Sequence, residues 1–204
     1  MPLFYQHTIN DTTKLAVWHI TEREDFFLEN VQLQKKIHHP HKRLQHLAGR
    51  YLLQLLQPGF PFHLIEIAES NKPLLLNEAF HFSISHCGDF AAAIVCENES
   101  AGIDVELITP KIELIKNKFL NETEQKFLPT VNAQLLTLFW SCKEAVYKWY
   151  GRAGVDFKSH IVIKNILINN HKGIVECQFV KNQQKDLVIH FQFFENLCLA
   201  WVIG

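Results

Sequence analysis

Two acidic residues in one short apolar run could bind a metal ion. Asp104 and Glu106 alternate with Ile103 and Val105 in a segment typical of a strand, so both carboxylates would point to the same face. Carboxylate oxygens are the ligands that a hard cation such as Mg²⁺ takes in proteins. An acidic strand face turned to solvent would show the same pattern, so the pair needs support from elsewhere in the chain.

A second stretch, residues 139–148, supplies complementary chemistry. It contains a third carboxylate, Glu144, and two ammonium groups, Lys143 and Lys148. Carboxylates and ammonium groups together can hold a metal ion beside a polyphosphate. Glu144 and Lys148 are also one helical turn apart, and as a plain surface ion pair they would contribute only about 0.3–0.5 kcal/mol.

Two weaker candidates lie upstream. Ser85 and His86 follow an alternating strand-like run and could present a hydroxyl and an imidazole to a phosphate, although one of 12 histidines is more often a surface residue. Lys72 and Pro73 could place an ammonium group beside a flat ring. An Asn-Lys-Pro turn needs no ligand to explain it, however.

The elements that must position these residues follow from the spacing of apolar side chains. Apolar residues at three- and four-residue steps predict helices, and alternating or continuous apolar runs predict strands. The predicted helices cover about 41–57, a segment starting at Asn121, and 133–150, and the predicted strands cover about 63–68, 80–84, 90–96, 101–107, 160–168, 173–180, 187–194 and 197–203. Strict strand–helix–strand alternation is missing, so the sequence favours the α+β class.

The segment from Asn121 has a local signature of its own. Glu124 stands three residues after Asn121, which is the spacing of a helix capping box. The carboxylate of Glu124 is therefore expected to bind backbone N–H groups at the start of a helix.

The chain divides naturally into an N-terminal α+β half, residues 1–100, and a C-terminal α+β half, residues 101–204. Both halves end on a short apolar strand, at 90–95 and at 197–202, which is a weak indication of a duplicated unit. No low-complexity linker separates the halves, so we expect them to share an interface that could hold a ligand.

The composition excludes several classes of partner. There are 21 acidic and 20 basic residues, so no overall positive field favours nucleic acid or a membrane surface. The first residues lack the pattern of a secretory signal, and the apolar runs are too short to span a bilayer. The five cysteines form no CxxC pair, so we expect reduced thiols in an intracellular, cytoplasmic protein.

The order of these motifs resembles the Sfp-like class of 4'-phosphopantetheinyl transferases. The resemblance covers Lys72-Pro73, residues 82–88, the Gly-Ile-Asp-x-Glu strand at 102–106, and the Trp-Ser-x-Lys-Glu segment at 140–144 that continues to Lys148. Lys143 follows Asp104 by 39 residues. One departure is Cys87, where these enzymes commonly have a second serine, which weakens one hydrogen-bond donor.

The resemblance implies a pseudodimer of two similar α+β halves with coenzyme A in the cleft between them. Residue by residue, it implies Mg²⁺ on Asp104, Glu106 and Glu144, phosphate contacts from Lys143 and Lys148, the 3'-phosphate of coenzyme A on Ser85 and His86, and adenine beside Lys72 and Pro73. Arg43 and Arg50 are further candidates for phosphate contacts, in a region where the match is loose.

The implied reaction is that of a holo-[acyl-carrier-protein] synthase. The phosphopantetheine arm of coenzyme A passes to a serine of an apo acyl or peptidyl carrier protein, and 3',5'-ADP leaves. The serine needs a base, for which Glu124, Glu144 and a metal-bound water are alternatives. We expect a monomer, because two fused halves already form the cleft.

Two other functions use the same residues. A magnesium-dependent phosphohydrolase acting on a nucleotide would place water where the transferase places serine. A non-catalytic relative would bind coenzyme A or a carrier protein without turnover. Products formed without a carrier, and turnover of a Glu144→Ala variant, separate these functions from the transferase.

Overall fold

The computed structural model describes residues 2–33, 36–76, 79–126, 132–182 and 184–204, and its mixture of helices and antiparallel strands confirms the α+β class. The N-terminal elements are β1 (Leu3–Asn10), β2 (Thr13–His19), α1 (Glu24–Leu28), α2 (Pro40–Leu56), a 3₁₀ helix η1 (Phe62–Leu64), β3 (Ile65–Ile67), β4 (Pro73–Leu75), β5 (His81–Cys87) and β6 (Phe90–Cys96). The C-terminal elements are β7 (Ala101–Leu107), a 3₁₀ helix η2 (Pro110–Ile115), α3 (Lys116–Phe119), α4 (Glu122–Lys126), α5 (Ala133–Tyr150), β8 (Ile161–Asn169), β9 (Lys172–Val180), β10 (Gln184–Phe193) and β11 (Leu197–Ile203).

The strands form two large sheets and one small one. The N-terminal sheet has the order β1-β2-β6-β5, and the C-terminal sheet has the order β7-β11-β10-β9-β8. All neighbours in them are antiparallel. In both sheets the last strand in the sequence lies between an early strand and the strand just before it, as β2-β6-β5 and β7-β11-β10. β3 and β4 pair separately.

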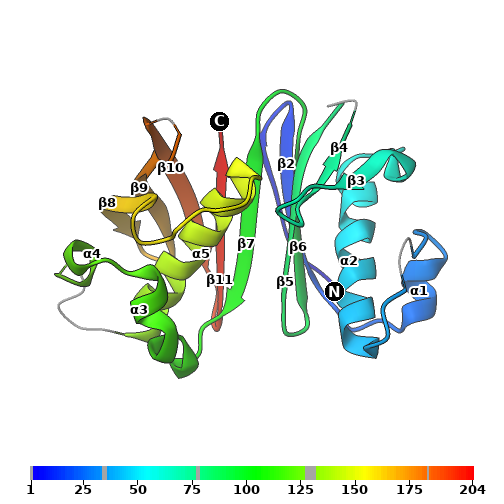
Figure 1. Cartoon of the computed structure of the whole chain (residues 1–204). Helices are drawn as coiled ribbons and strands as arrows, with labels where there is room; N and C mark the ends of the chain where they lie inside the picture. The colour runs from blue at the N-terminus through cyan, green and yellow to red at the C-terminus, as the bar shows by residue number, and fades with distance from the viewer. Residues whose placement is uncertain (1, 34–35, 77–78, 127–131, 183) are drawn as a thin grey trace.

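The two large sheets lie between the two long helices, so the molecule has four layers (Figure 1). One core cluster packs α2 against the N-terminal sheet, a second fills the space between the sheets, and a third packs α5 against the C-terminal sheet. Alternation along β7 decides which residues enter which layer: Ile103 and Val105 pack between the sheets, and Asp104 points the other way.

Local sequence signals explain where α5 begins and ends. The Asn132 side chain accepts a 2.7 Å hydrogen bond from the backbone N–H of Leu135, which caps the first turn. At the other end Gly151 adopts φ 71°, a left-handed conformation that glycine adopts without steric cost. The predicted helix 133–150 is therefore confirmed at both ends.

A glycine lets β7 approach α5 closely enough to bring their functional residues together. A Cβ atom on Gly102 would lie 2.0 Å from the backbone oxygen of Ala145 and 2.7 Å from the backbone nitrogen of Trp149. Only a residue without a side chain fits there. The Gly102 position thus places Asp104 next to the last turns of α5.

Most strand predictions are confirmed, with differences near the N-terminus. The strands at 90–96, 101–107 and 197–203 have the predicted bounds, whereas the strand predicted at 63–68 is the 3₁₀ helix η1 followed by the short strand β3. The sequence patterns did not predict β1, β2 or α1. All five cysteines are free thiols, as predicted. In the part of the chain that the structure describes, no helix is both long and apolar enough to cross a membrane.

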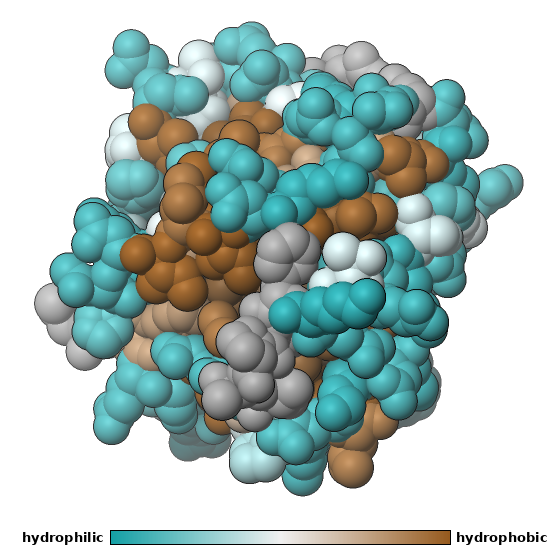
Figure 2. All heavy atoms as spheres, turned by 90° about the vertical axis from the view of Figure 1, so that its left-hand side faces the viewer, coloured by the Kyte–Doolittle hydropathy of each residue, from teal (hydrophilic) through white to brown (hydrophobic). Residues whose placement is uncertain are grey.

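Apolar side chains also reach the surface at the outer end of the C-terminal sheet. Leu167 and Ile168 of β8 and Val188 of β10 are 53%, 49% and 47% exposed. Figure 2 faces this side of the molecule and shows apolar side chains gathered among hydrophilic ones.

Candidate active site

Three polar side chains from both halves of the chain meet at the junction of the two sheets. The Ser85 hydroxyl on β5 donates a 2.8 Å hydrogen bond to the Asp104 carboxylate on β7. The Lys148 ammonium on α5 contacts the same carboxylate oxygen at 2.7 Å and the Ser85 oxygen at 2.8 Å. The structure therefore brings together three residues that are 19, 44 and 63 positions apart in pairs.

Asp104 has one oxygen available. Its side chain is 3% exposed, and Oδ1 accepts both bonds just described. Among the described residues no donor reaches Oδ2, although that atom is buried. A buried carboxylate oxygen without a partner is costly, so the position suits a bound cation or an ordered water.

Glu106 lies two residues further along the same face of β7. Trp140 Nε1 on α5 donates a 3.2 Å hydrogen bond to Glu106 Oε1, and the Cys87 thiol is a further hydrogen-bond donor to this carboxylate. Burial and the neighbouring Asp104 charge raise the pKa of Glu106 above its ordinary value. Burial and Glu106 together raise the pKa of the Cys87 thiol to about 12, so the thiol stays protonated.

Glu144 completes the acidic group from α5. Burial raises the pKa of its carboxyl to about 7, and the charges of Asp104 and Glu106 contribute to this rise, while Lys148 opposes it. Two negative neighbours disfavour a third negative charge. The three carboxylates that the sequence predicted as a set thus lie close enough to influence one another.

The carboxylates do not form a ready metal cage. Within residues 2–33, 36–76, 79–126, 132–182 and 184–204, no group of three or more His, Cys, Asp or Glu side chains has metal-binding geometry. Lys148 and Ser85 hold one oxygen of Asp104, and Trp140 holds one of Glu106. The donor set still fits Mg²⁺, because the buried Asp104 Oδ2 lacks a partner among the described residues. A cation would also relieve the repulsion from Asp104 and Glu106, which adds to the effect of burial on the pKa of Glu144.

A basic pocket of about 370 Å³ adjoins this group on the N-terminal side. Arg50 lines it together with His46, four residues earlier on α2, and His86. Arg50 is 5% exposed, and no acceptor among the described residues reaches its Nε. Burial lowers the pKa of this guanidinium to about 10. A buried cation with an open donor facing a pocket is suited to an anion.

A smaller pocket of about 190 Å³ continues toward α5. Its lining includes Lys72 and Pro73 from the N-terminal half and Tyr147 and Lys148 from α5. Burial lowers the pKa of Lys72 to about 8. Pro73 lines both pockets, so the two form one cleft. Lys148, which lines the smaller pocket, contacts Asp104 and brings this carboxylate beside the cleft.

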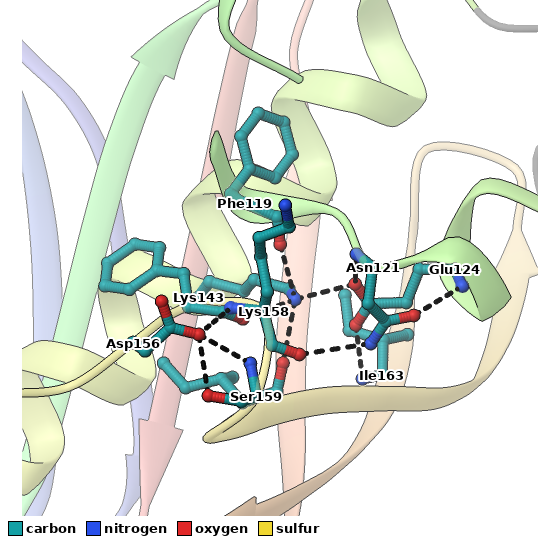
Figure 3. Close-up of polar contacts among 10 residues, drawn as sticks. Phe119, Asn121, Glu124, Lys143, Asp156, Lys158, Ser159 and Ile163 are labelled. Carbon is teal, nitrogen blue, oxygen red and sulfur yellow. Dashed lines mark hydrogen bonds and ion pairs between the residues drawn. The ribbon is translucent and has the colours of Figure 1, made fainter. Parts of the chain in front are cut away.

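Lys143 and Glu124 do not lie in this cleft, contrary to the phosphate-binding and base roles that the sequence suggested. The Lys143 side chain is 0% exposed, and its ammonium contacts the Glu124 carboxylate at 2.8 Å (Figure 3). Glu124 is also 0% exposed and forms a reciprocal capping box with Asn121 at 2.9 and 3.0 Å. The capping prediction for Glu124 is confirmed, and neither residue can reach a substrate from this position.

Arg43 is also placed away from the cleft. Its guanidinium contacts the Glu24 carboxylate on α1 at 2.6 Å and the backbone oxygen of Ile37 at 3.2 Å. These contacts hold the side chain against α1. Of the two candidate arginines, the structure brings only Arg50 into the cleft lining described above.

Comparison with known proteins agrees with the geometry. Residues 100–202, just over half of the chain, match the family described as the 4'-phosphopantetheinyl transferase superfamily. The chain belongs to this superfamily. A curated relative, "4'-phosphopantetheinyl transferase psf-1" of Bacillus pumilus, is 30% identical over 99 residues, which are 46% of this chain and 42% of the relative. The alignment thus spans less than half the length of that relative. The match to the family model confirms the family that the motifs indicated.

The matched region of this superfamily member includes only part of the site. Asp104, Glu106, Glu144 and Lys148 all lie within residues 100–202. The cleft residues contributed by the N-terminal half lie outside it, among them Ser85 and Arg50. Their proximity to the matched residues is supported by the structure alone.

Reasoning from the sequence missed three residues that line the site of this superfamily member. Trp140 and His46 each stand four residues before an identified candidate, Glu144 and Arg50 respectively, on the same helix face. That spacing could have indicated both. Tyr147 lines the smaller pocket and stands three residues after Glu144, a spacing that could have indicated it as well.

Proposed function

We propose that this protein transfers the 4'-phosphopantetheine group of coenzyme A to a serine of an apo carrier protein and releases 3',5'-ADP. The observation that carries the proposal is the meeting of Ser85, Asp104 and Lys148 beside a basic cleft that is lined from both halves of the chain. A cleft with cationic walls and an acidic end suits a diphosphate that binds together with Mg²⁺.

The nucleotide end of coenzyme A fits the larger pocket. Its 3'-phosphate would bind the open donors of Arg50 with help from His86, which both line that pocket. The adenine would lie against the apolar lining, to which Pro73 and Ile84 contribute. Lys72 lines the adjoining smaller pocket and, with its pKa near 8, gains charge when an anion binds nearby.

The diphosphate end fits the acidic part of the cleft. Asp104, Glu106 and Glu144 would hold Mg²⁺, which would neutralise phosphate charge when bound. The Lys148 ammonium, now on Asp104 and Ser85, would contact a phosphate oxygen and stabilise the charge that develops on the leaving group. Ser85, whose hydroxyl donates to Asp104, would orient that carboxylate, in place of the 3'-phosphate contact that the resemblance implied.

The reaction forms one bond and breaks one. The carrier serine oxygen attacks the β-phosphorus, the bond from that phosphorus to the bridging oxygen breaks, and 3',5'-ADP takes the electron pair. The serine proton must pass to an acceptor in the cleft. Glu124 is occupied by Lys143 and by backbone N–H groups, which leaves Glu144 and water as the acceptors.

A groove next to Glu106 would receive the carrier protein. It measures about 360 Å³, and Trp140, Ile112 and Lys111 are among its lining residues. Leu114 beside it is 85% exposed. Carrier helices near the modified serine are generally acidic, so a partly apolar surface that includes Lys111 suits them.

The architecture supports a further part of the proposal. The shared strand order β2-β6-β5 and β7-β11-β10, each sheet with one long helix on its outer face, is what a duplicated α+β unit would give. We propose that the two halves are residues 1–100 and 101–204, and that the protein is a monomer of the holo-[acyl-carrier-protein] synthase type. We also propose a cytoplasmic location, with which the five free thiols agree.

Release of 3',5'-ADP from coenzyme A, measured with Mg²⁺ and with or without an apo carrier protein, tests the proposal. Release that requires the carrier supports it. Release without a carrier would favour a phosphohydrolase, which uses water in place of serine. Binding of 3',5'-ADP without any release, against several carriers, would favour a non-catalytic relative.

A further inference from the structure

Two opposite charges are fully buried next to the cleft without entering it. Lys143 and Glu124 are both 0% exposed and 2.8 Å apart. Burial lowers the pKa of Lys143, and Glu124 opposes that shift. Removing two charges from water is costly, so this pair is an unusual feature of the C-terminal core.

The ammonium of Lys143 joins helix α5 to four separate segments. It contacts the backbone oxygens of Phe119, Phe157 and Ile161 and the carboxylate of Glu124, each at 2.8 Å. These acceptors belong to α3, to the loop before β8, to the start of β8 and to α4 (Figure 3). No proton of the ammonium is left for a substrate.

Both carboxylate oxygens of Glu124 likewise accept hydrogen bonds. One carboxylate oxygen accepts from the backbone N–H of Ile163 at 2.8 Å, and the other accepts from Asn121 at 3.0 Å as well as from Lys143. The pair is therefore a fixed connection between α5 and the segments around it.

Lys143 directly precedes Glu144 on α5. Successive residues of a helix are about 100° apart around its axis, so fixing the Lys143 side chain on one side fixes the direction of Glu144 on the next. Lys148, one turn after Glu144, is oriented by the same helix rotation. The connection thus controls where α5 presents its two cleft residues.

A second route leads from the same connection to Glu106. The centroid of the Trp140 ring lies 5.4 Å from that of the Phe119 ring and 5.6 Å from that of the Phe157 ring. Phe119 and Phe157 are also the residues whose carbonyls accept from Lys143. Trp140 then donates to Glu106, so the same two residues that fix Lys143 also hold the indole that orients this carboxylate.

We infer that Lys143 and Glu124 are positioning residues, which aim Glu144, Lys148 and Glu106 into the cleft without touching substrate. The inference rests on the proposed function, in which those three residues bind the cation and phosphate. It replaces the direct phosphate and base roles first assigned to the pair. If the pair only stabilised the fold, any core substitution that destabilises the protein equally would weaken cation binding at the site equally.

The test is the affinity for Mn²⁺, measured by electron paramagnetic resonance in the presence of 3',5'-ADP, below the unfolding temperature of every variant. Lys143→Met should weaken Mn²⁺ binding about tenfold and lower Tm by about 10 °C. Glu124→Gln, which keeps the size of the side chain, should weaken binding in the same direction and serves where Lys143→Met does not fold.

Two comparisons separate positioning from stability. Phe27→Ala empties a fully buried position on α1, in the core cluster that packs α2 against the N-terminal sheet. It should lower Tm similarly while Mn²⁺ affinity stays within twofold. Lys143→Met weakens Mn²⁺ affinity by some factor in the wild type. In a Glu144→Gln background that factor should be at least threefold smaller, because the route through Glu144 is already lost. Equal factors in both backgrounds, or an equal loss in Phe27→Ala, would overturn the inference.

The outcome is distinguishable from failure of the proposed function, because Mn²⁺ binding needs no carrier protein. If the variants behave as expected but no carrier is modified, the positioning role stands and the transferase proposal fails. If carriers are modified but Lys143→Met binds Mn²⁺ like the wild type, the positioning role fails alone. A wild type that binds no Mn²⁺ with 3',5'-ADP would overturn the cation assignment and this inference with it.

Discussion

The hydroxyl of Ser85 lies 2.8 Å from the Asp104 carboxylate, and this hydrogen bond joins the N-terminal sheet to the C-terminal one. Both residues are buried, at 7% and 2% exposure. A serine from one half therefore orients the carboxylate that the other half supplies to the cleft. The site depends on the contact between the sheets as much as on either motif.

Ser85→Ala should lower transfer activity about tenfold and stability by about 1 kcal/mol, because Asp104 and Lys148 lose a shared partner. Thr13→Val is the control, since the buried Thr13 hydroxyl donates a 3.2 Å hydrogen bond to Cys96 Sγ within the N-terminal sheet and neither residue lines the cleft. The control should lose similar stability and keep its activity. Steady-state rates and urea unfolding measure both, and equal activity losses would contradict the role given to Ser85.

Glu144→Gln should remove part of the pH dependence of stability. The pKa of Glu144 in the folded, metal-free protein is raised from 4.5 to about 7, so the folded state binds this proton more tightly than the unfolded chain. The stability that this provides is present below pH about 4.5 and is lost as pH rises through about 7. Relative to the wild type, the variant should gain up to about 3 kcal/mol between these pH values, measured by urea unfolding in EDTA. A difference that is constant with pH would contradict the shift.

Arg50→Met should reduce the preference for coenzyme A over 3'-dephospho-coenzyme A about tenfold, because a charge-assisted hydrogen bond is lost. Arg43→Met is the matched control on the same helix, since that guanidinium is held by Glu24. The control should keep the preference of the wild type. Calorimetry measures the affinity of each variant for coenzyme A and for 3'-dephospho-coenzyme A. An equal loss of affinity for both ligands in Arg50→Met would mean that Arg50 does not bind the 3'-phosphate.

Gly102→Ala should destabilise the protein by about 3 kcal/mol, because its Cβ would meet the backbone of α5 rather than a side chain that can move. Gly59→Ala provides the comparison, since Gly59 has φ 78° and nothing within 4 Å of the added carbon. Backbone strain alone should cost it about 1 kcal/mol. Urea unfolding curves give both values, and similar costs would mean that β7 and α5 are not in tight contact.

Much of the C-terminal half could be predicted from local patterns. The helix α5 was found because apolar residues recur at helical spacing through 133–150, and β7 was found because Ile103 and Val105 alternate with carboxylates. The missed hairpin β1–β2 includes an edge strand whose side chains are mostly exposed. Such a strand lacks the apolar alternation on which the prediction depends.

The candidate site shows where sequence reasoning fails. The three carboxylates were found because they stand in short motifs with clear chemistry. Lys143 was assigned to the cleft because it stands in the same family motif as Glu144, yet neighbouring residues on a helix face different surroundings. Its acceptors at Phe119, Phe157 and Ile161 come from other elements, and no local pattern reveals such contacts.

The most direct test of the proposed function is intact-mass analysis of apo acyl and peptidyl carrier proteins incubated with this protein, coenzyme A and Mg²⁺. EDTA and an Asp104→Ala variant serve as controls, because Asp104 holds the buried oxygen that is open to the cation. We predict a gain of one phosphopantetheine group per carrier that both controls abolish. A carrier mass unchanged across the panel, or a gain that survives both controls, would contradict the assignment of the reaction to this cleft.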